Sequence, residues 1–193
     1  MVGGKIMKKI YIVMTYTGTV LSYLIKNITK TPYAHVSISM NEDLRPMYSF
    51  GRLNPKIPIF AGFVEENINE GLYELRPNTM CRVYSLEVND FQYMKLKENI
   101  DKVSDERKMY SYDVEALIRV PLNRAKKRDY RYVCSHFVAD MLLKSEINIF
   151  DIPAYEVIPN NFFEVESLKL EYEGLLSKYK VNKSSVVNDM VSI

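Results

Sequence analysis

The sequence predicts a protein of the α+β class, because strand-like and helix-like segments are mixed along a chain of 193 residues. Apolar runs and apolar–polar alternation predict strands at 9–15, 34–40, 47–50 and 81–88. Apolar residues at helical spacing predict helices at 19–28, 89–103 and 132–145. Since no internal repeat or linker interrupts these segments, we expect one domain over residues 9–180.

The first predicted strand lies close to the N-terminus. Lys8 and Lys9 precede an apolar run, as in a signal peptide, but threonines interrupt the run and no clean cleavage site follows. No segment approaches the roughly 20 apolar residues that a membrane-spanning helix needs. We therefore expect a cytoplasmic protein with no transmembrane segment, in which residues 1–8 form a flexible leader.

The strand at 34–40 has two unlike faces. One face carries the apolar residues Ala34, Val36, Ile38 and Met40, and the other carries His35, Ser37 and Ser39. A turn at 41–43 leads to the strand at 47–50, which we expect to pair with the strand at 34–40. Residues 51–62, with their prolines, are expected to form a long loop of the kind that borders sites.

The second half of the chain continues the α+β pattern. Asn89 or Asp90 is expected to cap the helix that runs through Val103. Residues 110–120 predict a short turn that leads to a helix, and residues 168–179 predict a terminal hairpin. The polar residues 181–193 are expected to form a mobile tail.

Composition excludes several classes of function. A net charge of +2 gives no support to a nucleic-acid partner. Two cysteines without a small-domain framework fit a reducing compartment rather than a disulfide scaffold. Two histidines and two dispersed cysteines lack the spacing of a zinc site, and no glycine-rich phosphate loop follows a strand. We therefore expect neither a metal nor a cofactor.

Cys134 is the strongest candidate for chemistry, because it stands at the predicted start of an amphipathic helix. There the helix dipole favours a thiolate, which is the nucleophilic form of cysteine. Buried structural cysteines are also common, and that alternative stays open. Cys81, in a predicted strand with Val83 and Tyr84, is interpreted as structural.

A catalytic thiol needs a base, and the chain offers two histidines. His136 lies two residues after Cys134, about 200° around the helix, so we expect it to be an exposed or packed helix residue. His35 lies on the polar face of a strand and can accept the thiol proton and return it to a leaving group. Cys134 and His35 are therefore the candidate nucleophile and base.

Two segments resemble a known family. Thr31-Pro32-Tyr33-Ala34-His35-Val36-Ser37-Ile38 resembles the histidine strand, and Tyr132-Val133-Cys134-Ser135-His136-Phe137-Val138 the cysteine helix, of the circularly permuted NlpC-type papain-like hydrolases. The YiiX-like bacterial proteins and lecithin:retinol acyltransferase belong to this group. The resemblance implies a small antiparallel sheet packed against the cysteine helix. It also implies attack of the cysteine on a carbonyl, which gives a thioacyl intermediate.

The family also implies a third polar residue, on the strand after the histidine, that orients the imidazole. Here that strand is 47–50, and Ser49 is our first choice and Tyr48 our second. His136 departs from the family, in which an amide is common at that place. Tyr110 and Tyr112, together with Tyr48, are candidates to line the substrate pocket.

A basic run precedes the cysteine helix, and we interpret it either as a solvated surface or as a rim that attracts an anionic substrate, such as a peptidoglycan carboxylate or a lipid phosphate. Its members are Arg124, Lys126, Lys127, Arg128 and Arg131.

The leading expectation is thus a thiol hydrolase of amide bonds. The family resemblance suggests cell-wall peptides as its substrates. The alternatives are an acyltransferase or lipid esterase with the same Cys–His dyad, or a non-catalytic binding domain of the same fold. The expected partner is a small peptide, amide or acyl substrate, and the pattern does not define the oligomeric state.

Overall fold

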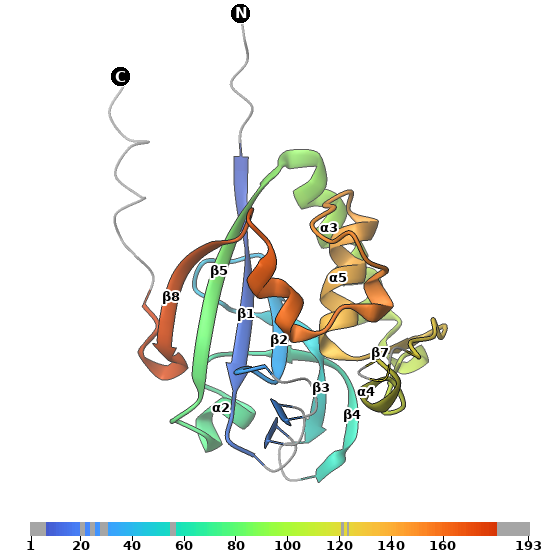
Figure 1. Ribbon diagram of the computed structural model, residues 1–193. Helices are drawn as coiled ribbons and strands as arrows, with labels where there is room; N and C mark the ends of the chain where they lie inside the picture. The colour runs from blue at the N-terminus through green and yellow to red at the C-terminus, as the bar shows by residue number, and fades with distance from the viewer. Residues whose placement is uncertain are drawn as a thin grey trace, which may run out of the picture.

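The computed structural model describes residues 7–19, 22–23, 26–27, 31–54, 57–120, 122 and 124–180, with the side chains of 57–60 excepted. Its centre is a six-stranded antiparallel sheet in the order β4-β3-β2-β1-β5-β8 (Figure 1). Those strands are β1 (Met7–Tyr16), β2 (His35–Ser39), β3 (Met47–Asn54), β4 (Ile57–Glu66), β5 (Met80–Asn89) and β8 (Lys169–Leu175). A short parallel pair is formed by β6 (Ser111–Tyr112) and β7 (Arg131–Tyr132). Sheet and helices together make the protein α+β, as the sequence predicts.

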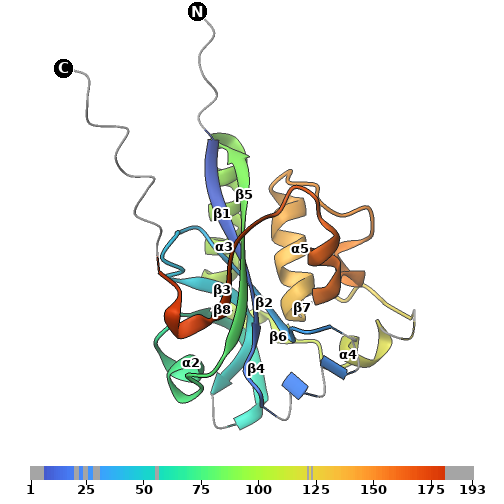
Figure 2. The same cartoon turned by 60° about the vertical axis from the view of Figure 1, so that its left-hand side comes forward.

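Helices cover both faces of the sheet. The longer helices α3 (Asp90–Asp105) and α5 (Cys134–Lys144) pack on one face, and the short α2 (Gly71–Leu75) lies on the other (Figure 2). The helix α4 (Ala116–Arg119) lies between β6 and β7 in the chain. Single-turn or short 3-10 helices complete the described chain at Arg107–Met109, Ala154–Glu156, Pro159–Glu164 and Leu176–Lys178.

Strand alternation divides the apolar residues between two cores. Along β1, Ile12 and Met14 face α3 and α5, whereas Tyr11 and Val13 face α2. The core under α5 is the larger one, and it includes Phe137 and other fully buried residues of that helix. This packing fixes the first turn of α5 against β2 and β3, which α5 contacts directly.

The predicted helix at 89–103 is confirmed with its cap. The side chain of Asn89 accepts from the backbone N–H of Gln92, and the Gln92 side chain accepts from the N–H of Asn89. Each side chain satisfies a backbone donor that the first helical turn leaves without a carbonyl partner. The predicted helix around Cys134 is likewise observed.

Two sequence predictions are wrong. Residues 51–62 are not a loop, because β3 continues to Asn54 and β4 begins at Ile57. Pro58 is tolerated there because β4 is the edge strand of the sheet. Residues 168–179 form no hairpin either: β8 pairs with the distant β5 and is followed by a 3-10 turn.

Some expectations concern residues outside the described ranges. Half of the predicted helix at 19–28 lies outside them, and so do the tail at 181–193 and most of the leader at 1–8. Among the described residues, no helix combines the length and apolar character required to cross a bilayer.

Candidate active site

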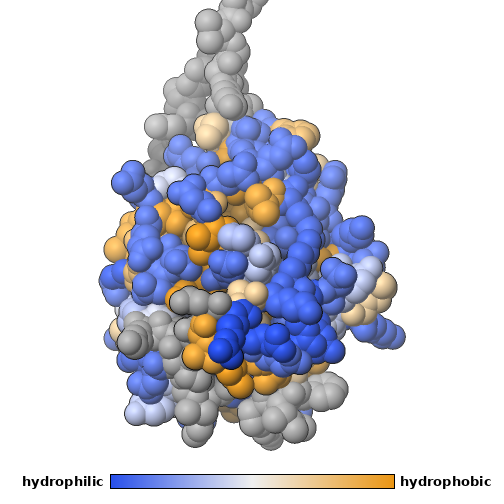
Figure 3. Space-filling view, turned by 45° about the vertical axis from the view of Figure 1, so that its right-hand side comes forward, coloured by the Kyte–Doolittle hydropathy of each residue, from blue (hydrophilic) through white to orange (hydrophobic). Residues whose placement is uncertain are grey.

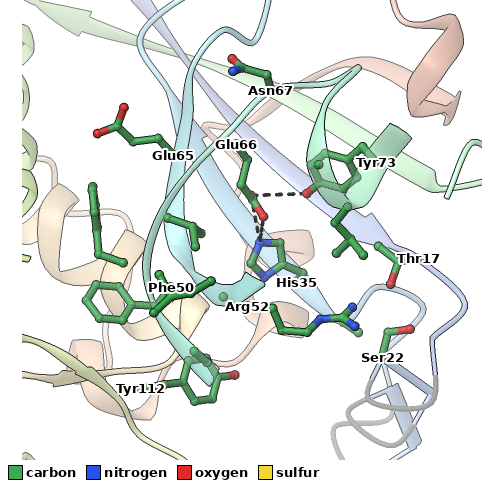
Figure 4. A pocket seen from close by; sticks show the side chains of 18 of the residues that line it. Thr17, Ser22, His35, Phe50, Arg52, Glu65, Glu66, Asn67, Tyr73 and Tyr112 are labelled. Carbon is green, nitrogen blue, oxygen red and sulfur yellow. Dashed lines mark hydrogen bonds and ion pairs between the residues drawn. The ribbon is translucent and has the colours of Figure 1, made fainter. Parts of the chain in front are cut away.

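His35 is held by a carboxylate at the far end of the sheet's edge strand. The Nε2 atom of His35 lies 3.2 Å from Oε1 and 3.1 Å from Oε2 of Glu66 (Figure 4). His35 is the first residue of β2 and Glu66 is the last residue of β4. Because Glu66 occupies Nε2, the other ring nitrogen, Nδ1, is left for a reacting group.

Glu66 is itself fixed by two hydroxyl groups. Ser37 Oγ donates to Glu66 Oε2 over 2.7 Å, and the Tyr73 hydroxyl donates to the same oxygen over 3.3 Å. Burial raises the pKa of Glu66, but the His35 charge and these hydrogen bonds outweigh it, so the pKa lies below its usual value. The carboxylate is therefore ionised at neutral pH and ready to orient the imidazole.

The pKa of His35 moves in the opposite direction. Burial lowers it, and this is the largest single effect. The charge of Glu66 and side-chain hydrogen bonds with Cys134 and Glu66 together exceed the effect of burial, and the pKa rises to about 10. At neutral pH the His35 ring is consequently an imidazolium, the form that stabilises a neighbouring thiolate.

Cys134 is the first residue of α5, and its side chain is buried, with 5% exposed. The helix has 11 residues and begins without a side-chain cap. Its first-turn N–H groups thus have no intrahelical carbonyl partner. The Cys134 thiol lies close enough to His35 to contribute to the raised pKa of the His35 ring. The structure therefore brings together the two residues that the sequence singled out, although they lie far apart in the chain.

Ser49 does not contact the imidazole. Its hydroxyl donates to the carbonyl of Val36 over 2.6 Å and is fully buried. The paired residues of β2 and β3 end at Ile38 and Tyr48, so Ser49 satisfies a β2 carbonyl just beyond the last pair. The expectation that Ser49 orients His35 is therefore wrong. Glu66 makes the hydrogen bond to the His35 ring instead.

Sequence reasoning missed Glu66 because residues up to 62 were interpreted as a loop, so no strand was expected to end at position 66. The available signal was the pair Glu65-Glu66 directly after the apolar pair Phe63-Val64. A run of this kind marks the end of a strand that can present a carboxylate.

A cavity of about 690 Å³ opens beside His35. Its walls are largely apolar, and they come from β3, β4, α2 and the α4 segment. The apolar lining residues include Phe50, Leu53, Phe63, Leu72, Val114 and Leu117. Two arginines, Arg52 and Arg107, also line the cavity, and the Nη2 of Arg52 donates to Thr19 Oγ1 over 3.1 Å.

Cys134 borders a smaller neighbouring cavity of about 30 Å³. Ala34, Tyr112 and Leu117 line both cavities and therefore lie between them. Burial raises the pKa of the Tyr112 hydroxyl, and the negative charges of Cys134 and Asp113 raise it further. Tyr112 thus stays neutral beside the thiol.

The other two candidate aromatic residues serve in packing. Tyr110 lies in an aromatic cluster with Phe50 and Tyr132, and Tyr48 stacks on Phe63. Neither lines the two cavities described above. Of the three tyrosines proposed for the pocket, Tyr112 alone reaches them.

The remaining histidine and cysteine are placed as structural residues. His136 is 7% exposed and its ring lies 4.5 Å from that of Tyr132, so it is packed rather than exposed. Burial lowers the pKa of His136 to about 4. Cys81 is fully buried in β5, and burial, then the charge of Glu173, raise its pKa to about 12. Its thiol is correspondingly unreactive.

No protein-family model matches the chain, and a search of curated proteins finds no significant match. The chemistry that we assign to the site is therefore argued from its geometry. A thiol at a helix start, an imidazolium beside it and a carboxylate behind the imidazole are the components of nucleophilic acyl transfer.

Proposed function

We propose that the protein is a thiol hydrolase in which Cys134 is the nucleophile, His35 the general base and acid, and Glu66 the residue that orients His35. The observation that carries the proposal is the hydrogen-bonded His35–Glu66 pair, together with the effect of the Cys134 thiol on the pKa of His35. The order of histidine strand and cysteine helix along the chain favours a permuted papain-like enzyme, and a cytoplasmic location stays a prediction.

The reaction would proceed in two steps. The Cys134 thiolate attacks the substrate carbonyl carbon, the carbon–nitrogen bond breaks, and the His35 imidazolium gives its proton to the leaving amine. Water then gives a proton to His35 and attacks the thioester, which releases the acid and regenerates the Cys134 thiolate and the His35 imidazolium. Backbone N–H groups of the first turn of α5 would stabilise the oxyanion.

A second candidate is an acyltransferase or lipid esterase that uses the same dyad. The size and apolar walls of the cavity beside His35 favour it, because an acyl chain would bury its methylene groups there. In that reaction an alcohol or amine acceptor replaces water in the second step. Cell-wall peptides and acyl lipids thus remain the two substrate classes to compare.

The first test is alkylation of the protein by iodoacetamide, followed by mass spectrometry. Cys134 should react at least about 100-fold faster than Cys81 at pH 7, since Cys81 is buried and its pKa is raised. His35→Ala should slow Cys134 at least about tenfold and leave Cys81 unchanged. If Cys134 and Cys81 react alike in both proteins, a binding domain becomes the better account.

The second test separates the two reactions. The protein is incubated with p-nitrophenyl esters of increasing chain length and with γ- and α-linked dipeptide amides, and Cys134→Ala serves as the control. A thioacyl adduct on Cys134 and preference for long chains would favour the lipid reaction. Release of free amine from the dipeptides would favour the amidase, and turnover by Cys134→Ala would exclude both.

A further inference from the structure

The chain between β6 and β7 carries an exposed surface that the proposed chemistry does not use. We call it the α4 lip, and it consists of Val114, Ile118, Leu122, Arg124, Lys126, Lys127 and Arg131. Three of these residues are aliphatic and four are basic.

The aliphatic residues are unusually open to solvent. Val114 and Ile118 are each 62% exposed, and Leu122 is 59% exposed. They recur every four residues along a segment that includes α4, where the Val120 N–H donates to the Ala116 carbonyl and the Leu122 N–H to that of Arg119. Helical turns place residues at this spacing on one side, so the three form one apolar stripe.

The lip also carries four exposed basic residues, which follow α4 in the chain. Arg124, Lys126, Lys127 and Arg131 are exposed and make no ion pair with a described residue. In contrast, the neighbouring Arg128 binds Asp113 and Glu115. Asp129 is the one acidic residue within 124–131, so the net charge of this stretch is positive.

The lip adjoins the large cavity. Val114 and Leu117 line that cavity, and Ile118 and Leu122 continue the segment outward into solvent. Figure 3 turns the α4 side of the molecule toward the viewer and shows hydrophobic surface next to strongly hydrophilic surface on its lower half. An occupant of the lip would therefore lie at the mouth of the cavity.

We propose that the α4 lip docks the protein onto an anionic lipid surface. Exposed aliphatic side chains insert into the interface between headgroups and acyl chains, and flanking lysines and arginines bind the lipid phosphates and carboxylates. A single-stranded nucleic acid would instead call for stacking aromatic side chains among the basic ones, and the lip offers aliphatic residues in those places.

Docking would have a consequence for the substrate, and this consequence rests on the proposed function. A lipid or acylated molecule in the bilayer could move along Val114 and Leu117 into the cavity beside His35 without crossing water. The docking itself is independent of the chemistry, because none of the lip residues belongs to the Cys134–His35–Glu66 arrangement.

The test is co-sedimentation of the full chain with vesicles, measured without turnover. Vesicles of phosphatidylcholine with phosphatidylserine should bind the wild-type protein, and vesicles of phosphatidylcholine alone should bind it at least about tenfold less. Ile118→Asn/Leu122→Asn and Lys126→Glu/Lys127→Glu should each reduce binding to the anionic vesicles by about tenfold or more. Cys134→Ala should bind as the wild type does, which separates docking from catalysis.

Matched controls use residues of equal exposure elsewhere. Phe91→Asn removes an apolar side chain that is 60% exposed on α3, and Lys108→Glu/Lys178→Glu makes the same change in net charge as the basic-lip variant. Both should bind like the wild type. The proposal is overturned if the wild type does not bind anionic vesicles, or if the controls lose as much binding as the lip variants. It is equally overturned if Ile118→Asn/Leu122→Asn binds unchanged, or if a single-stranded oligonucleotide binds more tightly than the vesicles.

Discussion

Glu66 binds the imidazole of His35 with both carboxylate oxygens at Nε2, over distances of 3.2 and 3.1 Å. This contact joins the edge strand β4 to β2, with β3 between them in the sheet. It orients the ring and supplies the negative charge that keeps the ring protonated.

Replacing Glu66 with Gln tests this relationship, because the amide retains an oxygen acceptor and loses the charge. We expect the pKa of His35 to fall and the alkylation rate of Cys134 at pH 7 to drop about tenfold. An NMR titration of the His35 ring and the alkylation rate measure the two effects. Glu65→Gln is the matched control, since Glu65 is exposed and accepts from Ser104 rather than His35. Equal effects of the two variants would remove Glu66 from the mechanism.

Gly51 makes room for the His35 ring, and this predicts the effect of adding one methyl group. A Cβ atom at Gly51 would lie 3.3 Å from His35 Cε1 and 3.4 Å from Val64 Cγ2. We expect Gly51→Ala to displace the imidazole and to slow alkylation of Cys134 severalfold, with a small loss of stability.

Gly62→Ala is the control for that variant. Gly62 pairs with Gly51 across β3 and β4, but its added Cβ would meet the side chain of Leu53, which is half exposed and can move. Gly62→Ala should therefore leave Cys134 reactivity unchanged. If both alanines slow Cys134 equally, the effect comes from the strand pair and not from contact with His35.

Because His136 is buried and neutral, we expect the protein to lose stability in acid. Its pKa is about 4 in the folded protein and about 6.5 when unfolded, so between these values the unfolded chain binds more protons. The contribution of His136 to the free energy of unfolding should fall by about 1.4 kcal/mol per pH unit as pH drops from 6.5 toward 4. Urea unfolding of the wild type and of His136→Asn at several pH values measures it. A difference between the two proteins that does not change with pH would contradict the prediction.

The sequence is sufficient to place Cys134 at a helix start and His35 on a strand, because each lies in a local pattern of apolar and polar residues. It predicts the central strands and the capped α3 for the same reason. Glu66 carries only a weak local signal, a carboxylate pair after two apolar residues. Its role depends on the position of β4 beside β3 in the sheet, and the prolines near the hairpin obscure that strand in the sequence. Ser49 follows from the family's pattern of a polar residue on the strand after the histidine, but in the structure its hydroxyl donates to the Val36 carbonyl.

Tyr112 lines both the large cavity and the small cavity at Cys134, so we expect its side chain to control which reagents reach the thiol. Tyr112→Ala should join the 690 Å³ cavity to the small one at Cys134. Alkylation by a bulky pyrenyl maleimide should then accelerate at least about fivefold relative to iodoacetamide, because the barrier is steric. Tyr112→Phe retains the ring and should keep the wild-type ratio of the two rates. If Tyr112→Ala leaves that ratio unchanged, the thiol is reached by another path and Tyr112 serves in packing.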